Sequence, residues 1–451
     1  MPPGRKALPV NPPRPHLLPE APAVPADLLE RVRLDHERFA SGGLPAGLDD
    51  YLREAYGLDM AASYAGIPLR NPWGKASGQL TLRASQLEEA VAAGLGFAVL
   101  KTVIAQDAGG NQSMGAWAIR ESRMLAEPIT SPTTGARGWT ITWRGRGWWQ
   151  SFEEYLDLVR AGAALARARD FPVIPSVKYH LPGPGETEWR TDEYRETTTR
   201  LLDAWAEAGG SDPMPLEKDF SPTLAGSDRV GARAQVLQWL DLVPGLIRAA
   251  APGRVKVGLK LFNSLDEDSF QLAMLAAVHG ENRPDFLIYA NRLFDPGREF
   301  EGVRGVAYGG PDLSDRNLRM LGAQREAQAA GRIPGPPLEI SATGDISTGR
   351  LAVEYALRGC TSFQIHTLFQ LPAEVFAMRV GTKLERALHR LIFDPGEGFI
   401  VWAYHAAGRL GLLGEGEAKV RFLDLAARGA ASALGVRDLD AQGPEVGNQS
   451  R

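Results

Sequence analysis

Short apolar segments alternate with longer amphipathic segments along most of the chain, from about residue 60 onward. Segments of this length that are rich in β-branched and aromatic residues are typical of buried strands. The predicted strands are Phe97–Val103, Trp139–Trp143, Val173–Tyr179, Leu216–Ser221, Val255–Leu261, Asp285–Asn291, Leu338–Gly344 and Ser362–Leu368. Predicted helices between them include Gln86–Ala93, Phe152–Ala166, Ala234–Ala250 and Arg350–Arg358. Alternating strands and helices indicate a parallel sheet of the α/β class, and eight strands over roughly 300 residues favour a closed (β/α)8 TIM barrel.

Four regions follow from this pattern. Residues 1–25 are rich in proline and lack periodicity, which is typical of a disordered tail. Residues 26–58 form an N-terminal helical extension, with predicted helices Ala26–Ala40 and Leu48–Tyr56. Residues 59–395 form the barrel, in which 181–215 is too long for a normal connection and is expected to be an insertion near the site, with its own helix at Tyr194–Ala208. Residues 396–451 supply C-terminal helices and a polar tail.

Composition narrows the functional classes. The 451-residue chain is 44% hydrophobic and has a formal net charge of −4, so nothing favours nucleic acid as a partner. The single cysteine, Cys360, and the scattered histidines argue against a disulfide framework or a metal site. We see no apolar run near the ~20 residues that span a bilayer, and no signal peptide, P-loop or nucleophile elbow. We therefore expect a soluble cytoplasmic protein without a membrane partner; a homodimer stays open.

Polar side chains gather at the predicted strand ends, where TIM barrels carry their chemistry. These residues are Lys101, Thr102, Lys218, Asp219, Ser221, Lys260, Asn291, Arg292, Thr343, Gly344, His366 and Thr367. Such types suit flavin mononucleotide (FMN). The Thr343-Gly344 and His366-Thr367 turns offer backbone N–H groups to a phosphate, and Lys260 is placed to stabilise reduced, anionic flavin. The hydroxyl of Ser221 is the candidate for taking the substrate proton.

Other interpretations stay open at this stage. A barrel lysine can simply extend to the rim, Ser221-Pro222 can be an ordinary turn, and Gly344 can serve only the strand-to-helix connection. A non-redox lyase or isomerase would use Lys101 or Lys218 as a Schiff-base lysine. A catalytically inactive barrel could act as a binding or scaffold protein. The tryptophans at 139, 143, 148 and 149 suit either core packing or a pocket wall.

The order of motifs from Ile67 to Leu391 resembles the dihydroorotate dehydrogenase family, especially its soluble, FMN-only branch. The motifs are Asn71-Pro72 with Ala76-Ser77-Gly78, Lys101-Thr102 with Gly110-Asn111, Ser221-Pro222-Thr223, Gly258-Leu259-Lys260, Asn291, Gly309-Gly310, Thr343-Gly344 and His366-Thr367. The resemblance implies pyrimidine metabolism, an FMN cofactor and an electron acceptor as second partner. It makes Ser221 and Lys101 the catalytic residues. It assigns flavin contacts to Ala76, Ser77, Gly78, Thr102, Lys218, Lys260, Gly309, Gly310, Thr343, Gly344, His366 and Thr367. Substrate contacts fall to Asn111, Trp143, Thr223, Asn291 and Arg292.

The chain departs from the family where the family holds its pyrimidine. Thr223 replaces one asparagine, and the loop from Trp143 to Trp148 lacks another. Lys218 stands in place of a flavin-contacting asparagine, and Asp345 in place of a glycine at the phosphate turn. Lost amides leave polar groups of an imide ring unpaired, so dihydroorotate is expected to be a poor substrate. Arg144, Arg146 and Arg292 add positive charge near the predicted site, which suits an anionic substrate. The resemblance therefore implies an oxidoreductase that acts on a C–C single or double bond of a small anionic molecule.

Overall fold

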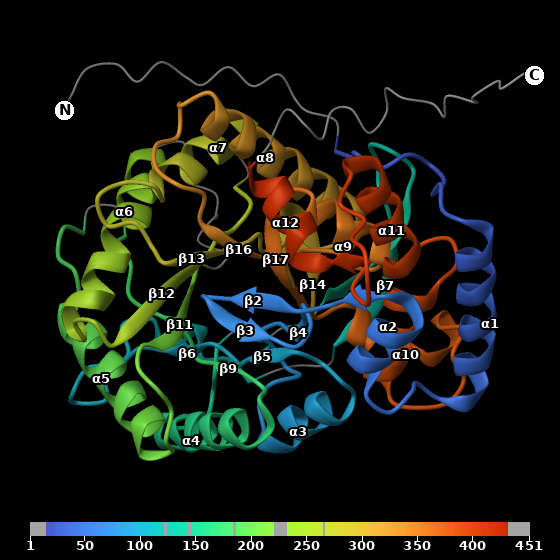
Figure 1. Cartoon of the computed structure of the whole chain (residues 1–451). Coiled ribbons are helices and arrows are strands. Elements are labelled where there is room, and N and C mark those ends of the chain that lie inside the picture. The colour runs from blue at the N-terminus through green and yellow to red at the C-terminus, as the bar shows by residue number, and fades with distance from the viewer. Residues whose placement is uncertain are drawn as a thin grey trace, which may run out of the picture.

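A closed barrel of eight parallel strands forms the centre of the molecule. The computed structural model describes residues 15–120, 124–142, 147–183, 186–220, 232–264 and 267–431. The barrel strands are β4 (Trp73–Lys75), β5 (Phe97–Val99) with β6 (Val103–Ile104), β9 (Val173–Ile174) with β10 (Ser176–Lys178), β11 (Met214–Asp219), β12 (Val255–Lys260), β13 (Phe286–Tyr289), β16 (Glu339–Thr343) and β17 (Cys360–Ile365). Because β5 pairs with β9 and β6 pairs with β10, two interrupted strands close the sheet into a ring. The ring in Figure 1 confirms the predicted (β/α)8 fold.

A helix follows each barrel strand and packs on its outer face (Figure 1). These helices are α3 (Ala84–Ala92), α4 (Phe152–Arg169), α5 (Thr191–Glu207), α6 (Arg233–Ala250), α7 (Asp268–Ala277), α8 (Pro311–Ala329), α9 (Gly349–Ala356) and α10 (Lys383–Phe393). Local sequence fixes their starts. Ser151 and Glu154 form a reciprocal capping box at the first turn of α4, and Thr382 and Glu385 do the same for α10.

Two expectations about the barrel were wrong. The first barrel strand was expected at Phe97–Val103. It is instead the three-residue β4, which is too short to stand out as an apolar run. Of the strand predicted at Trp139–Trp143, the described residues 139–142 belong instead to β8 (Arg137–Thr142), which pairs antiparallel with β7 (Leu125–Thr130) outside the barrel. In addition, 181–215 is not an extra insertion. Its helix α5 packs between α4 and α6 and is the regular connection from β10 to β11.

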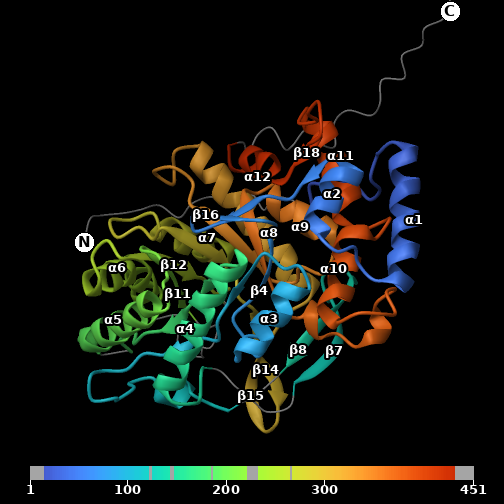
Figure 2. The ribbon, with the colours of Figure 1, turned by 60° about the horizontal axis from the view of Figure 1, so that its bottom comes forward.

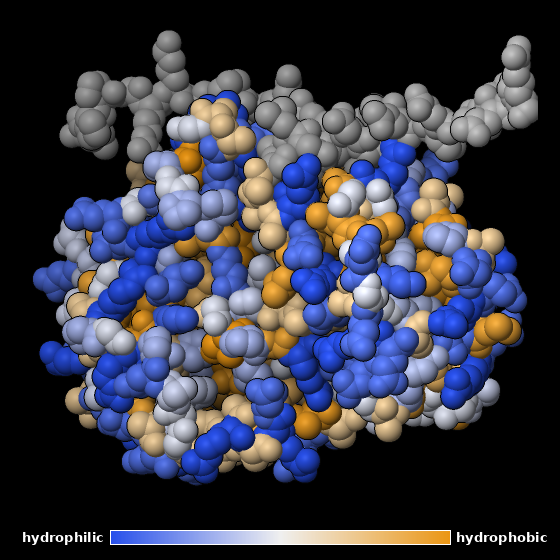
Figure 3. Space-filling view, in the orientation of Figure 1, coloured by the Kyte–Doolittle hydropathy of each residue, from blue (hydrophilic) through white to orange (hydrophobic). Residues whose placement is uncertain are grey.

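Hairpins lie at both ends of the barrel. At the carboxyl ends of the strands, the β7–β8 hairpin contacts the hairpin of β14 (Leu293–Phe300) and β15 (Val303–Tyr308), as Figure 2 shows. Arg298 and Glu127 join the two with a 2.9 Å ion pair. At the opposite end, β2 (Ala62–Tyr64) and β3 (Ile67–Leu69) cross the centre of the ring, and Tyr64 packs on Phe97 and Phe286. On that face, hydrophobic residues are scattered among hydrophilic ones (Figure 3). The barrel is thus closed at its amino end, which leaves the carboxyl end for a site.

The terminal regions pack together on one side of the barrel. They contain α1 (Ala26–Gly42), α2 (Leu48–Tyr56), α11 (Phe399–Leu410), α12 (Phe422–Ala431) and a small parallel pair of β1 (Leu58–Asp59) with β18 (Val420–Arg421). Short 3-10 turns lie at Gly115–Trp117, Leu368–Gln370 and Ala373–Val375. Within the described ranges, no helix combines the length and apolar character needed to cross a membrane.

Candidate active site

One large cavity lies at the carboxyl ends of the barrel strands. Its volume is about 940 Å³, at the upper end of the range typical of ligand pockets. The β7–β8 hairpin contributes Gly138 and Trp139 to its wall, and the β14–β15 hairpin contributes Phe300 and Val306. These two hairpins, which extend from the barrel, therefore enclose the space above the strand ends.

Most of the described residues predicted for the site line this cavity. They are Ala76, Ser77, Gly78, Lys101, Thr102, Lys260, Asn291, Arg292, Gly309, Thr343, Gly344, His366 and Thr367. The tryptophans divide between the two roles considered for them. Trp139 lines the cavity, whereas Trp148 is buried in the core with its indole N–H bonded to the Ser151 carbonyl.

Three other predicted residues do not line the cavity. The ammonium of Lys218 donates to the carbonyls of Tyr179 and Asp219 at 3.2 Å, within the barrel wall. Gly310 is instead the turn residue before α8, with φ +100°. The Asn111 side chain is bonded to the exposed carboxylate of Asp107, at 3.0 and 3.2 Å. Ser221, Thr223, Trp143, Arg144 and Arg146 lie outside the described residues.

The base of the cavity carries a lysine cluster, which we define as Lys101, Lys178 and Lys260 together with Asp219. The Lys178 ammonium lies 3.4 Å from the Asp219 carboxylate and 4.8 Å from the centre of the Trp117 ring. Burial acts to raise the pKa of Asp219, but Lys178, Lys260 and Lys218 together outweigh it and lower that pKa. Its Oδ1 atom is buried and has no hydrogen-bond partner in the described part of the chain. Three ammonium groups against one carboxylate favour an anionic ligand.

Lys178 and Asp219 were missed, although the sequence carries a signal for both. Side chains alternate between the two faces of a strand, so Glu217 and Asp219 share one face of β11, and Lys218 points to the other. At this strand end, Asp219 therefore faces the cavity. The prediction that Lys218 does so was wrong. The same alternation places Lys178 beside it on β10, where the register pairs Val177 with Lys218.

Residues 345–348 and Thr367, in the turns after β16 and β17, line the same cavity. Among the described residues, the N–H groups of Asp345, Ile346, Ser347 and Thr348 donate to no other group, and neither does that of Thr367. Thr348 is also the N-cap of α9, whose dipole adds partial positive charge. Paired turns after the seventh and eighth strands are where TIM barrels often bind phosphate. The geometry therefore fits an anionic phosphate group.

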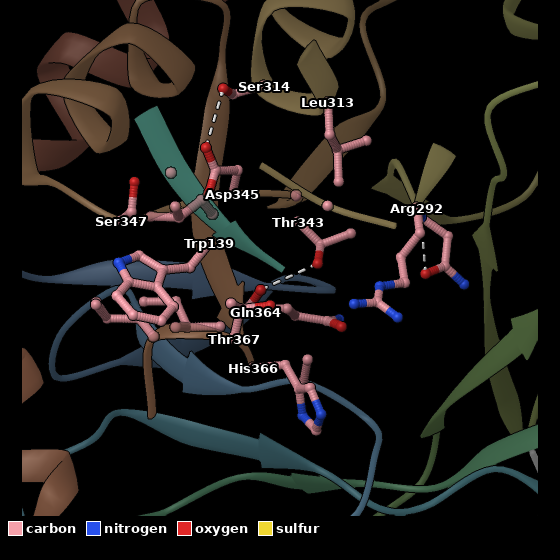
Figure 4. Close-up of a pocket in the computed structure, with 18 of the residues that line it drawn as sticks. Trp139, Arg292, Leu313, Ser314, Thr343, Asp345, Ser347, Gln364, His366 and Thr367 are labelled. Atoms are coloured by element: carbon pink, nitrogen blue, oxygen red, sulfur yellow. Dashed lines mark hydrogen bonds between the residues drawn. The ribbon is translucent and has the colours of Figure 1, made fainter. Parts of the chain in front are cut away.

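Asp345 fits this interpretation despite its acidic side chain. Its carboxyl turns toward Ser314, whose hydroxyl donates a long hydrogen bond of 3.5 Å (Figure 4). Burial raises the pKa of the Asp345 carboxyl to about 8, so the group is largely uncharged at neutral pH. Gly344, which precedes it, has φ +110°, and a Cβ there would lie 2.5 Å from the Asn317 amide nitrogen. The tight turn thus depends on glycine at this position.

His366 and Arg292 shape the middle of the cavity. Burial, reinforced by Arg292 and by nearby lysines, lowers the pKa of His366 to about 3, so its imidazole is neutral. A Cβ on Gly78 would lie 2.6 Å from that ring, which requires glycine in the turn after β4. The guanidinium of Arg292 donates to the carbonyls of Ile141 and Ala307 and so holds the two hairpins to the strand end. Figure 4 shows this side chain beside Thr343 and His366. Arg292 therefore has a clear structural role besides its place in the cavity wall.

The N-terminal segment 15–23 was expected to be part of a disordered tail, but it is bonded to the barrel beside the cavity. His16 lies 3.0 Å from the Asp315 carboxylate and 3.7 Å from that of Glu354. Glu354 also accepts the backbone N–H groups of Leu17 and Leu18, at 2.9 and 2.8 Å. Pro15 and His16 line the cavity near its phosphate end. Periodicity could not reveal this segment, since its structure depends on partners that lie 299 residues or more along the chain.

We expect this contact to weaken at alkaline pH. Hydrogen bonds to Asp315 and Glu354 raise the pKa of His16 from its ordinary 6.5 to about 9. Because the folded-state pKa is the higher one, the stabilisation is fully present below pH 6.5 and is lost as the pH rises through about 9. Thermal unfolding of the wild type and His16→Gln, measured from pH 6 to pH 10, should show a difference in Tm that disappears at the alkaline end. A difference that is constant across this range would contradict the assignment.

Neither a protein-family model nor a curated protein matches the chain. Among solved structures, the chain is similar to DHODH from Eimeria tenella in complex with ferulenol, at 15% identity and a TM-score of 0.46. The match covers 78% of this chain and 88% of that one. At such low identity the function has to be inferred from this chain's own residues.

Proposed function

We propose that the protein is an FMN-dependent oxidoreductase that acts on a C–C single or double bond of a small anionic substrate. The observation that carries this proposal is that one cavity contains both the lysine cluster and the turns after β16 and β17. The backbone N–H groups of these turns donate to no other group among the described residues. One end suits a phosphate, and the other suits a group that becomes negatively charged on reduction. FMN has both features. When bound, it would accept a hydride from the substrate and pass the electrons on.

Each part of the cavity has its own role in this proposal. The turns at 345–348 and Thr367 would hold the phosphate, and Lys260 would stabilise the reduced cofactor. Lys101 and Lys178 would attract and orient the substrate anion, and Asp219 would accept a hydrogen bond from it. Ser221 is the candidate proton acceptor from the sequence alone. A substrate other than dihydroorotate suits this charged cluster better, because an imide ring needs neutral amide partners.

The non-redox alternative has less support. Burial, reinforced by Lys178, lowers the pKa of Lys218 well below its usual range, as a Schiff-base lysine requires. However, its ammonium is engaged with two carbonyl groups in the barrel wall and does not line the cavity. A carbonyl substrate in the cavity would meet Lys101 instead.

We expect the phosphate turns to make the protein prefer FMN over riboflavin by at least about tenfold in Kd, because charged groups gain more from each hydrogen bond. Gly344→Ala should reduce this preference, since the added Cβ forces the turn apart. Gly253→Ala is the matched control, because Gly253 also has a positive φ of +73° but nothing lies within 4 Å of the position that a Cβ would take. Isothermal titration with both flavins tests this. Equal affinities in the wild type would remove the phosphate assignment.

A further inference from the structure

A chain of buried polar side chains runs from the cavity into the barrel interior. The Lys260 ammonium donates to the side-chain oxygen of Gln364 at 3.3 Å. The amide nitrogen of Gln364 donates to Glu217 Oε1, and the Tyr64 hydroxyl donates to the same oxygen. None of the four residues is more than 5% exposed. Glu217 is therefore linked to the cavity lysine through a single amide.

The partners of Gln364 fix its orientation. An ammonium group only donates, so the amide oxygen must face Lys260 and the NH₂ group must face Glu217. The Thr343 hydroxyl, which donates to the Gln364 carbonyl at 3.0 Å, anchors the backbone at this point (Figure 4). Glu217 consequently holds the amide oxygen of Gln364 toward Lys260.

The surroundings of Glu217 disfavour its ionised form. Burial raises the pKa of Glu217, whereas Lys260 and the hydrogen bonds from Tyr64 and Gln364 act to lower it. The titratable groups that face it are Tyr64 of the β2–β3 hairpin, Lys260 of β12, Tyr155 of α4 and Asp219 on its own strand. A charge in such a water-poor interior acts strongly on its neighbours.

We propose that Glu217 is a positioning residue that sets, through Gln364 and Lys260, how strongly the site stabilises reduced FMN. This inference rests on the proposed function, because it assumes that FMN binds beside Lys260. Ionised Glu217 offsets the charge of Lys260 and so disfavours the negative charge gained on reduction. Neutral Glu217 leaves the ammonium charge fully available to the cofactor.

The test is the midpoint potential of bound FMN in the wild type and in Glu217→Gln, measured from pH 4 to pH 10. Glutamine keeps the acceptor for Gln364 and Tyr64 but cannot ionise. The two proteins should agree at low pH. As Glu217 ionises, the reduced state should become about tenfold more favourable in Glu217→Gln than in the wild type, or about 30 mV for two electrons. Glu193→Gln is the control: this buried carboxylate is bonded to Ser113 and does not line the cavity, so its profile should match the wild type.

Tyr64→Phe gives a second, independent result. It removes a hydrogen bond to the carboxylate, so the pH at which the potential begins to fall should move upward. Coincident profiles of Glu217→Gln and the wild type at every pH, or an unmoved inflection in Tyr64→Phe, would overturn the role of Glu217 while leaving FMN binding intact. A wild-type protein that takes up no FMN would overturn the proposed function as well.

Discussion

Replacing Ser221 by alanine is expected to slow substrate-driven flavin reduction by about 10²–10⁴-fold, the usual contribution of a positioned proton acceptor. FMN should stay bound. Ser221 lies outside the described residues, so this prediction rests on the sequence, in which Pro222 restrains the preceding residue to an extended backbone.

A serine hydroxyl is a weak base and needs a neighbour that takes up its proton. The structure narrows the candidates: Lys101 and Asp219 line the cavity, whereas Lys218 is engaged elsewhere. Anaerobic stopped-flow bleaching of the flavin, with a reductive substrate found by screening, measures the rate. Ser221→Cys is the matched control and should keep most of it. If Ser221→Ala is as fast as the wild type, the proton goes to another group and the catalytic motif has been misassigned.

The second large effect concerns Lys260. Its ammonium is buried at the base of the cavity, where a positive charge stabilises an added negative charge much more than it would in water. Lys260→Ala should make reduction of bound FMN at least about tenfold less favourable, a fall of about 30 mV, or should abolish FMN binding.

The same strand supplies a control for Lys260→Ala. Lys256 also lies on β12, but its ammonium donates to the Ala65 carbonyl at the amino end of the barrel. Lys256→Ala should therefore keep the wild-type potential. Spectroelectrochemical titration compares the three proteins. An unchanged potential and affinity in Lys260→Ala would mean that Lys260 is structural.

The sequence predicts the architecture well where apolar runs are long. The last five barrel strands and α2 lie within a few residues of their expected bounds, because buried strands and amphipathic helices have distinct periods. The prediction fails where tertiary contacts decide the structure. The three residues of β4 form a strand only because β5 and β17 pair with them on either side. The residues of β8 alternate like those of a barrel strand, but β8 pairs with β7.

The candidate site was predicted to the level of the strand ends but not of single atoms. Lys101, Lys260 and the turns after β16 and β17 do meet in one cavity. The prediction assigned Lys218 to the site in place of Asp219, because a one-residue change of register moves a side chain to the other face of the strand. The contact between Gln364 and Glu217 had no signal in the sequence, since it joins strands 147 residues apart.

The most direct test of the central proposal is the absorption spectrum of the purified protein, recorded before and after incubation with FMN and desalting. We expect a yellow protein with a flavin spectrum and about one FMN per chain. The phosphate-site variant Gly344→Ala should lose this FMN, whereas Gly253→Ala should retain it. A colourless protein that retains no added FMN would contradict this proposal and would favour a barrel with another function.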